Sequence, residues 1–225
     1  MFGFFKKNTR STETKLYADL KPGERILKIF TEHIVPLMNE NGFVFKKKEF
    51  SFIKKFDSFT QHIHVRKSKW NQRGEVCSFS LTFMVNSEFY SNWLKETYGN
   101  EVGGTVWYIE QPFWDVWTKD HNSGYDLEAH DNLEILEDLK YNLTELCFPF
   151  MNNISDFKGA ADFLYSFYES PVWELMIVDF YFIAGEKDLA LKVLYEIIDN
   201  YKKRNDVTPK LRERLKLRTD FFGVK

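Results

Sequence analysis

Cysteine is scarce in this sequence, which has two in 225 residues, Cys77 and Cys147. They lie far apart in the chain, and neither belongs to a Cys-x-x-Cys pair or to a Cys/His cluster. Isolated thiols of this kind give no support to a disulfide framework or a zinc knuckle. We therefore expect both to be reduced thiols, as in cytosolic proteins.

Long hydrophobic runs are also missing. No segment reaches the roughly 18 uncharged apolar residues that a membrane helix needs. The apolar run within residues 1–10 is too short for the core of a signal peptide, because polar residues follow it at once. We therefore expect a soluble cytoplasmic protein that makes no membrane contact.

Catalytic signatures are absent as well. The sequence contains no Gly-x-Ser-x-Gly, no Walker-type phosphate loop, no His-Glu-x-x-His and no dinucleotide fingerprint. It therefore predicts no catalytic residue, no metal ligand and no cofactor, and it favours a non-enzymatic role.

Apolar and aromatic residues are plentiful, at 44% and 18% of the chain, so it can form a hydrophobic core. Charge is unevenly distributed although the net charge is only -2. Residues 42–75 hold nine bases and three acids, whereas residues 88–139 hold twelve acids and two bases. If these two segments form opposite faces of the protein, their charges can steer a charged partner. If the segments adjoin, their charges neutralise each other, and we favour this second interpretation.

Hydrophobic periodicity predicts an α+β fold. Apolar residues at helical spacing predict a helix over 24–41, ended by Asn41-Gly42 and bent or divided at Pro36. Period-two patterns predict strands at 43–48, 50–56, 59–69 and 76–86, with a hairpin at 71–74 that favours antiparallel pairing.

Helices dominate the remainder. A short helix is expected at 88–98, two further strands at 105–110 and 113–118, and a long amphipathic helix at 131–152 with Asp131 as N-cap. More helices are expected at 155–168, 172–184, 187–203 and 208–218. The predicted architecture is an N-terminal helix packed on an antiparallel sheet of about five or six strands, followed by a mainly helical region. Its divisions are a loose arm at 1–22, an α+β domain at 23–168 and a helical extension at 169–225, packed on the same domain.

Four segments carry a family resemblance: 37–48 (LMNENGFVFKKK), Phe52 with Phe56, 61–70 (QHIHVRKSKW) and 79–86 (FSLTFMVN). Together they resemble the bacterial domain-of-unknown-function family numbered 4304, over roughly residues 24–168. The resemblance implies a helix ending in Gly-Phe, a positively charged strand and a strand ending at Asn. It implies no catalytic residues, and it implies a link to toxin-neutralising systems of bacteria. The C-terminal helices fall outside it.

A candidate polar face lies on the strand predicted at 59–69. His62, His64, Arg66 and Ser68 alternate along this strand and so project from one side. Two imidazoles on one face can bind a metal, with a third ligand such as His121, Asp126 or His130. A solvent-facing polar row explains the same residues, and we favour it.

Two further alternatives stay open. Asp115, Asp120 and His121 near a glycine turn can form an acid/base pair, although an ordinary loop is favoured. Bases interleaved with aromatics can bind single-stranded nucleic acid, although the net charge and the missing ribonucleoprotein motif disfavour this role. The residues of that set are Phe45, Lys46, Lys47, Lys48, Phe50, Phe52, Lys54, Arg66, Lys67, Lys69 and Trp70.

The favoured function is a cytoplasmic, non-enzymatic protein-binding module, an immunity-type partner of another bacterial protein being one form of it. Large aromatics are favoured at interface hot spots, so the expected partner surface lies within the acidic segment 88–128 and contains Trp93, Trp107, Trp114 and Trp117. Core packing also explains these rings, and for any single one of them we favour it. The sequence carries no signal of oligomeric state.

Overall fold

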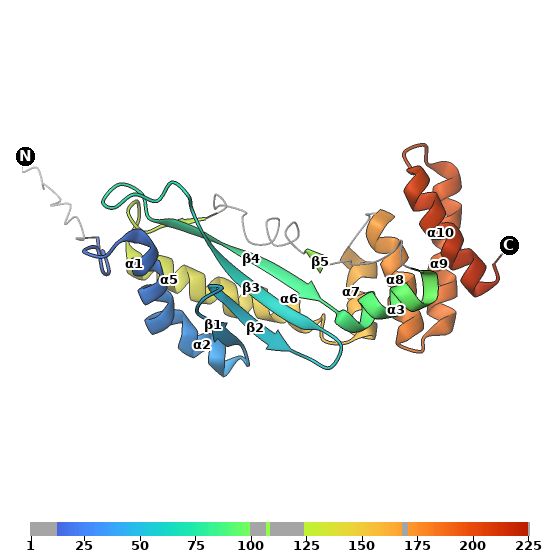
Figure 1. The fold of residues 1–225 in the computed structure, drawn as a ribbon, viewed down its shortest axis with the longest axis horizontal. Helices are drawn as coiled ribbons and strands as arrows, with labels where there is room; N and C mark the ends of the chain where they lie inside the picture. Colours follow the sequence, from blue (N-terminus) through green and yellow to red (C-terminus); the bar gives the residue numbers. More distant parts are fainter. Residues whose placement is uncertain (1–12, 100–106, 109–123, 168–170, 225) are drawn as a thin grey trace, which may run out of the picture. The chain divides into compact units, whose positions relative to one another are not determined.

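A computed structural model describes residues 13–99, 107–108, 124–167 and 171–224 (Figure 1). Their strands form an antiparallel sheet in the order β1 (Val44–Lys46), β2 (Ser51–Lys55), β3 (Thr60–Lys67), β4 (Ser78–Asn86) and β5 (Trp107–Tyr108). Strand β6 (Tyr125–Asp126) also pairs with β4, with Phe79 opposite Tyr125. Helices precede and follow the sheet, so the predicted α+β fold is confirmed.

The N-terminal helix changes its hydrogen-bonding pattern along its length. It begins as α1 (Pro22–Ile29), widens into the π-helical segment η1 (Phe30–Ile34) and ends as α2 (Val35–Glu40). Pro36 has no N–H to donate, and its ring would clash with the preceding turn of a regular α-helix. The expected bend at Pro36 therefore takes the form of a π segment just before it. Gly42 follows with a φ of +81°, the conformation expected of a helix-ending glycine.

The other helices are α3 (Glu88–Tyr98), α5 (Asn132–Tyr141), π-helical η3 (Asn142–Cys147), α6 (Phe148–Asn152), α7 (Phe157–Phe167), α8 (Pro171–Ile183), α9 (Lys187–Lys203) and α10 (Pro209–Phe222). Asp131 caps α5 as predicted, because its carboxylate accepts hydrogen bonds from the backbone N–H groups of Leu133 and Glu134. The strand expected at 113–118 lies outside the described residues, as does the expected boundary at 168–169.

The chain divides into two compact units. The first unit comprises Met1–Phe52, Ile63–Thr82 and Gln111–Glu145, and the second comprises Ile53–His62, Phe83–Glu110 and Leu146–Lys225. Each unit therefore gathers segments that are distant in sequence.

The core of the first unit joins the N-terminal helix to the sheet through aromatic rings. The ring of Phe30 lies 5.4 Å from that of Phe50 and 5.1 Å from that of Phe79, both edge to face, and 6.3 Å from that of Phe52. Each of these rings is at most 6% exposed. A fully buried Phe contributes about 1.5–3 kcal/mol, so this cluster fixes the helix against the strands.

Helix α8 forms the centre of the second unit and packs against α7 and α9. Every residue from Leu175 to Tyr181 is buried, which is typical of a helix surrounded by other elements. The Phe180 ring contacts those of Phe59, Tyr90 and Phe157, which come from a strand connection, α3 and α7. These rings tie the helices of this unit together.

The start of the described chain is held by hydrogen bonds. Asn132 N–H donates to the Thr14 carbonyl, and Leu16 N–H donates to the Asn132 side-chain oxygen. The structure describes residues 13–22 of the segment expected as a loose arm, and these bonds attach them to the start of α5.

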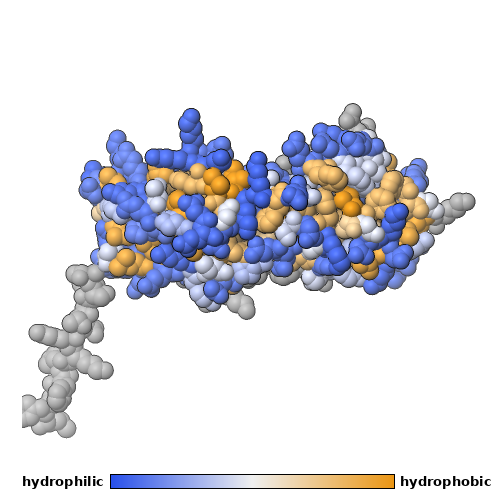
Figure 2. All heavy atoms as spheres, turned by 90° about the horizontal axis from the view of Figure 1, so that it is seen from below, coloured by the Kyte–Doolittle hydropathy of each residue, from blue (hydrophilic) through white to orange (hydrophobic). Residues whose placement is uncertain are grey.

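In one view of the surface, hydrophilic side chains cover most of the face, and hydrophobic ones show between them in scattered patches (Figure 2). Among the described helices, none has the length and apolar character required to cross a membrane.

Candidate functional site

The predicted polar face is present on β3. Buried and less buried residues alternate along this strand, with Gln61, Ile63 and Val65 buried. His62 and His64 are half-buried on the alternate positions, and Arg66 is exposed. Ser68 follows the strand, and its hydroxyl accepts a hydrogen bond from Trp70 N–H at 3.1 Å.

His64 is poorly placed to carry a positive charge. Partial burial lowers its pKa below the ordinary value of 6.5, and the neighbouring positive charge of Arg66 lowers it further, while Glu49 opposes the shift. The His64 imidazole is therefore neutral at pH 7. A neutral imidazole can accept a proton or bind a metal ion, so its surroundings decide its role.

The surroundings do not assemble a metal site. Within the described residues, no group of three His, Cys, Asp or Glu side chains lies close enough together to hold an ion. Of the third ligands considered, Asp126 accepts backbone hydrogen bonds from Cys77 at 3.2 Å and Glu128 at 2.9 Å. His121 and the whole Asp115–His121 loop lie outside the described residues.

Of the four tryptophans predicted to form the partner surface, the structure describes the side chain of Trp93 alone. Its half-buried ring lies against aromatic rings of its own unit, 5.4 Å from Tyr98 and 6.2 Å from both Phe182 and Phe221. Trp114, Trp117 and the side chain of Trp107 fall outside the description. Trp93 therefore packs within the second unit, and the other three stay predictions.

The connection between β3 and β4 is held by several hydrogen bonds. Asn71 links both sides, because its side-chain N–H₂ donates to the Ser78 carbonyl at 2.8 Å and its oxygen accepts from Ser78 N–H at 2.7 Å. Gln72 and Val76 exchange backbone hydrogen bonds at 2.8 and 2.9 Å. Gly74 completes the turn with a φ of +77°. These hydrogen bonds hold the backbone of the connection in a defined conformation.

This connection presents a tryptophan to solvent. Trp70 is 74% exposed, the highest value among the large hydrophobic side chains of the described residues. The Lys69 ammonium lies 4.9 Å from its ring centroid, and Arg66, Lys67 and Arg73 are also exposed. We call residues 66–73 the basic hairpin. It combines one large apolar ring with four positive charges, and the nearest acid along the chain is Glu75.

The basic hairpin does not continue into a row of exposed rings. Phe50 and Phe52, from the set considered for nucleic-acid stacking, are 6% and 1% exposed and lie in the core of the first unit. Phe45 packs on both of them at 6.0 and 4.8 Å. Single-strand binding uses successive stacking rings, so these contacts disfavour a stacking sheet.

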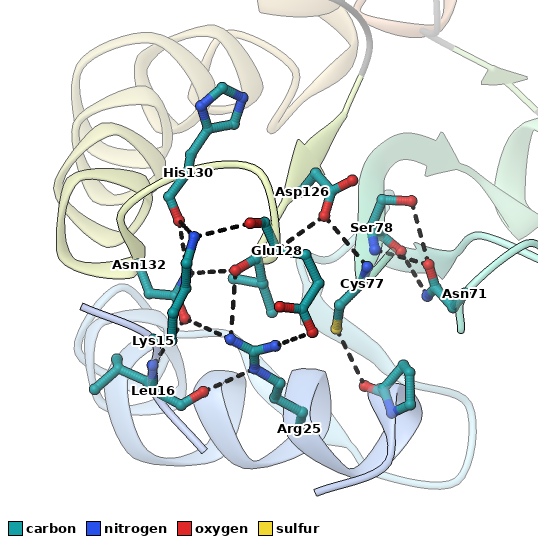
Figure 3. A network of polar contacts seen from close by, with 12 residues as sticks. Lys15, Leu16, Arg25, Asn71, Cys77, Ser78, Asp126, Glu128, His130 and Asn132 are labelled. Atoms are coloured by element: carbon teal, nitrogen blue, oxygen red, sulfur yellow. Dashed lines mark hydrogen bonds and ion pairs between the residues drawn. The ribbon is translucent and has the colours of Figure 1, made fainter. Parts of the chain in front are cut away.

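Two buried polar networks have a structural role. In the first unit, Arg25 is 1% exposed and donates to the Leu16 and Leu127 carbonyls, to Glu128 at 2.7 Å and to the Asn132 side chain at 2.9 Å (Figure 3). In the second unit, Asp179 is fully buried and accepts hydrogen bonds from both Arg218 and the hydroxyls of Tyr90 and Tyr98. Their polar groups satisfy one another, so neither network offers an open reacting group.

Sequence reasoning placed Trp70 only in the nucleic-acid set and did not single out its exposure. The available signal was its place beside Asn71-Gln-Arg-Gly74, a polar turn in which a large ring has little to pack against. No protein-family model, no curated protein and no solved structure is significantly similar to this chain. The resemblance to family 4304 therefore stays a prediction.

Proposed function

We propose that this protein is a non-enzymatic protein-binding module that contacts its partner through the basic hairpin. The observation that carries the proposal is Trp70, which is 74% exposed on a connection held by hydrogen bonds. Tryptophan and arginine are the side chains most enriched at interface hot spots. An exposed ring on a hydrogen-bonded connection, with Lys69 against it and further cations close by in the sequence, therefore supports binding to an acidic protein surface. A toxin that an immunity-type protein neutralises is one kind of partner with such a surface.

Covalent capture at the ring tests this function. A photoreactive benzophenone side chain replaces Trp70 in the full-length protein, and cells of the native host are irradiated. We expect cross-linked protein adducts at this position. The matched control carries the same group at Tyr195, which is 54% exposed in the second unit and should give no adduct.

Three results would contradict the proposal. One is the absence of any protein adduct at position 70, even with products of neighbouring genes co-expressed. Another is an adduct that nuclease removes, which would indicate nucleic acid as the partner. The third is stoichiometric zinc or manganese, in protein purified without a His-tag, that is lost in His62→Ala, since this would favour the enzyme alternative.

A further inference from the structure

The first unit carries a second exposed surface whose charge is opposite to that of the basic hairpin. Along α5 and into η3, the exposed side chains lie at positions 133, 134, 137, 140, 141 and 145, with Lys140 as one base beside three glutamates. We call them the acidic stripe, whose net charge is -2: Leu133, Glu134, Glu137, Lys140, Tyr141 and Glu145.

The acidic stripe also has the apolar groups that a tryptophan needs. Leu133 is 49% exposed and Tyr141 is 59% exposed, although both are large hydrophobic side chains. They are eight residues apart, which places them about 12 Å apart along the helix, with Glu137 between them. An aromatic ring that docks between them brings its neighbouring cations close to the three glutamates.

We infer that the partner of the basic hairpin is a second copy of this chain, bound through the acidic stripe. The inference rests on the proposed function, because it names the partner of the same surface. Both surfaces belong to the first unit, and each exposes apolar side chains beside charges of one dominant sign.

A two-fold symmetric dimer uses each surface twice. The hairpin of one copy contacts the stripe of its partner, and the symmetry axis generates the reciprocal contact. Exposed ion pairs contribute little individually, so the apolar contacts of Trp70 supply most of the affinity, and the charges set orientation and specificity. Charge complementarity also predicts that the dimer weakens as salt rises.

Sedimentation of the full-length protein tests this pairing. Wild type should form a dimer whose dissociation constant rises between low and high sodium chloride. Two double variants should each be monomeric at the same concentration. Lys69→Glu with Arg73→Glu lowers the net charge of the hairpin from +4 to 0 and sets two glutamates against those of the stripe, and Glu137→Lys with Glu145→Lys changes the net charge of the stripe from -2 to +2. We expect at least about a tenfold rise in the dissociation constant for each.

Mixing the two double variants gives the decisive result. In the mixed pair the two new glutamates of one hairpin face the two new lysines of the other chain's stripe, and the unaltered basic hairpin faces the unaltered acidic stripe, so opposite charges meet again in both contacts. The mixture should therefore form a heterodimer although each variant alone is monomeric. A control pair, Lys203→Glu with Lys210→Glu, alters exposed bases of the second unit and should leave the wild-type dimer unchanged.

Several outcomes would overturn the inference. One is a wild type that stays monomeric up to about 100 μM, which would leave less than about 5.5 kcal/mol of association free energy. The others are a dimer that survives both double variants, or two monomeric variants that do not associate when mixed. A cross-link from position 70 to a different protein would also overturn it, yet the proposed function would stand. Binding of an oligonucleotide by a monomer, lost in Lys69→Glu with Arg73→Glu, would contradict both. Circular dichroism of each variant shows whether it is folded.

Discussion

His64 shows how its neighbours on the sheet set the state of a single residue. Burial and the positive charge of Arg66 both disfavour its protonated form. The folded state therefore binds this proton less readily than the unfolded state does. Protonation of His64 should destabilise the fold, so its contribution to stability is complete above the unfolded pKa of about 6.5 and falls as the pH drops below it.

Replacing Arg66 by Ala should raise the pKa of His64, because one of the two causes of its depression disappears while burial remains. The measurement is a titration of the imidazole resonances by nuclear magnetic resonance between pH 4 and pH 9. Lys55→Ala, which removes an exposed charge at the end of β2, serves as control and should leave the midpoint unchanged. A pKa that falls or stays constant in Arg66→Ala would contradict the assigned cause.

For single residues, contacts between near neighbours in the sequence could be predicted, whereas contacts between residues far apart in the sequence could not. Asp131 was recognisable as a helix cap because the bonds it accepts come from residues two and three positions ahead. The burial of Arg25 depends on Glu128 and Asn132, which are 103 and 107 positions away. Sequence pattern carries no information on such a pairing, so Arg25 resembled any exposed base of an amphipathic helix.

Helix α10 shows how one buried side chain helps to hold an element on its unit. Arg218 is the residue of this helix that is buried, at 3% exposure. It donates to both carboxylate oxygens of Asp179 on α8 and to the Leu175 carbonyl at 3.1 Å, and its guanidinium lies 4.8 Å from the Tyr98 ring centroid. The leucines along α10 are only half-buried, so this network holds the helix on its unit together with Phe221 and Phe222, whose rings lie 5.1 and 5.2 Å from that of Phe182.

Replacing Arg218 by Met should therefore detach α10 before the rest of its unit unfolds. The change leaves the Asp179 carboxylate buried without its counter-ion, which costs about 3–5 kcal/mol for a buried ion pair. Limited proteolysis should cleave within 209–222 much faster than in wild type. Arg212→Met on the same helix alters an exposed arginine and should leave the cleavage rate unchanged. Equal protection of α10 in Arg218→Met and wild type would show that other contacts hold it.

Periodic elements could be predicted closely, whereas irregular ones could not. The bounds of α3 and α9 agree with the spacing of their apolar residues, and β2 and β3 begin within a residue of the predicted starts. The segments η1 and η3 were missed, because a π turn has the same apolar pattern as an α turn. The candidate site could be predicted in part. The alternation of residues placed His62 and His64 on one face of the strand, but the exposure of Trp70 depends on which other side chains pack near the turn, and the sequence does not show this.

At the scale of the whole molecule, segments distant in sequence combine in each unit. Ile53–His62 and Phe83–Glu110 group with the C-terminal residues 146–225. Each unit has its own buried charged network, centred on Arg25 in the first and on Asp179 with Arg218 in the second. The stability of each unit can therefore be lowered separately, by substituting a residue of its own network.

Hydrogen exchange of Arg25→Met and Arg218→Met should therefore show different local effects. Arg25→Met leaves Glu128 and buried carbonyl groups without their donor, so exchange should rise first in α1, β6 and the start of α5. Arg218→Met should raise exchange first in α3, α8 and α10, whose side chains meet at Asp179. Each variant serves as the control of the other. If both variants instead raised exchange by the same amount throughout the described residues, the units would open as one cooperative structure, and assigning each network to the stability of its own unit would be wrong.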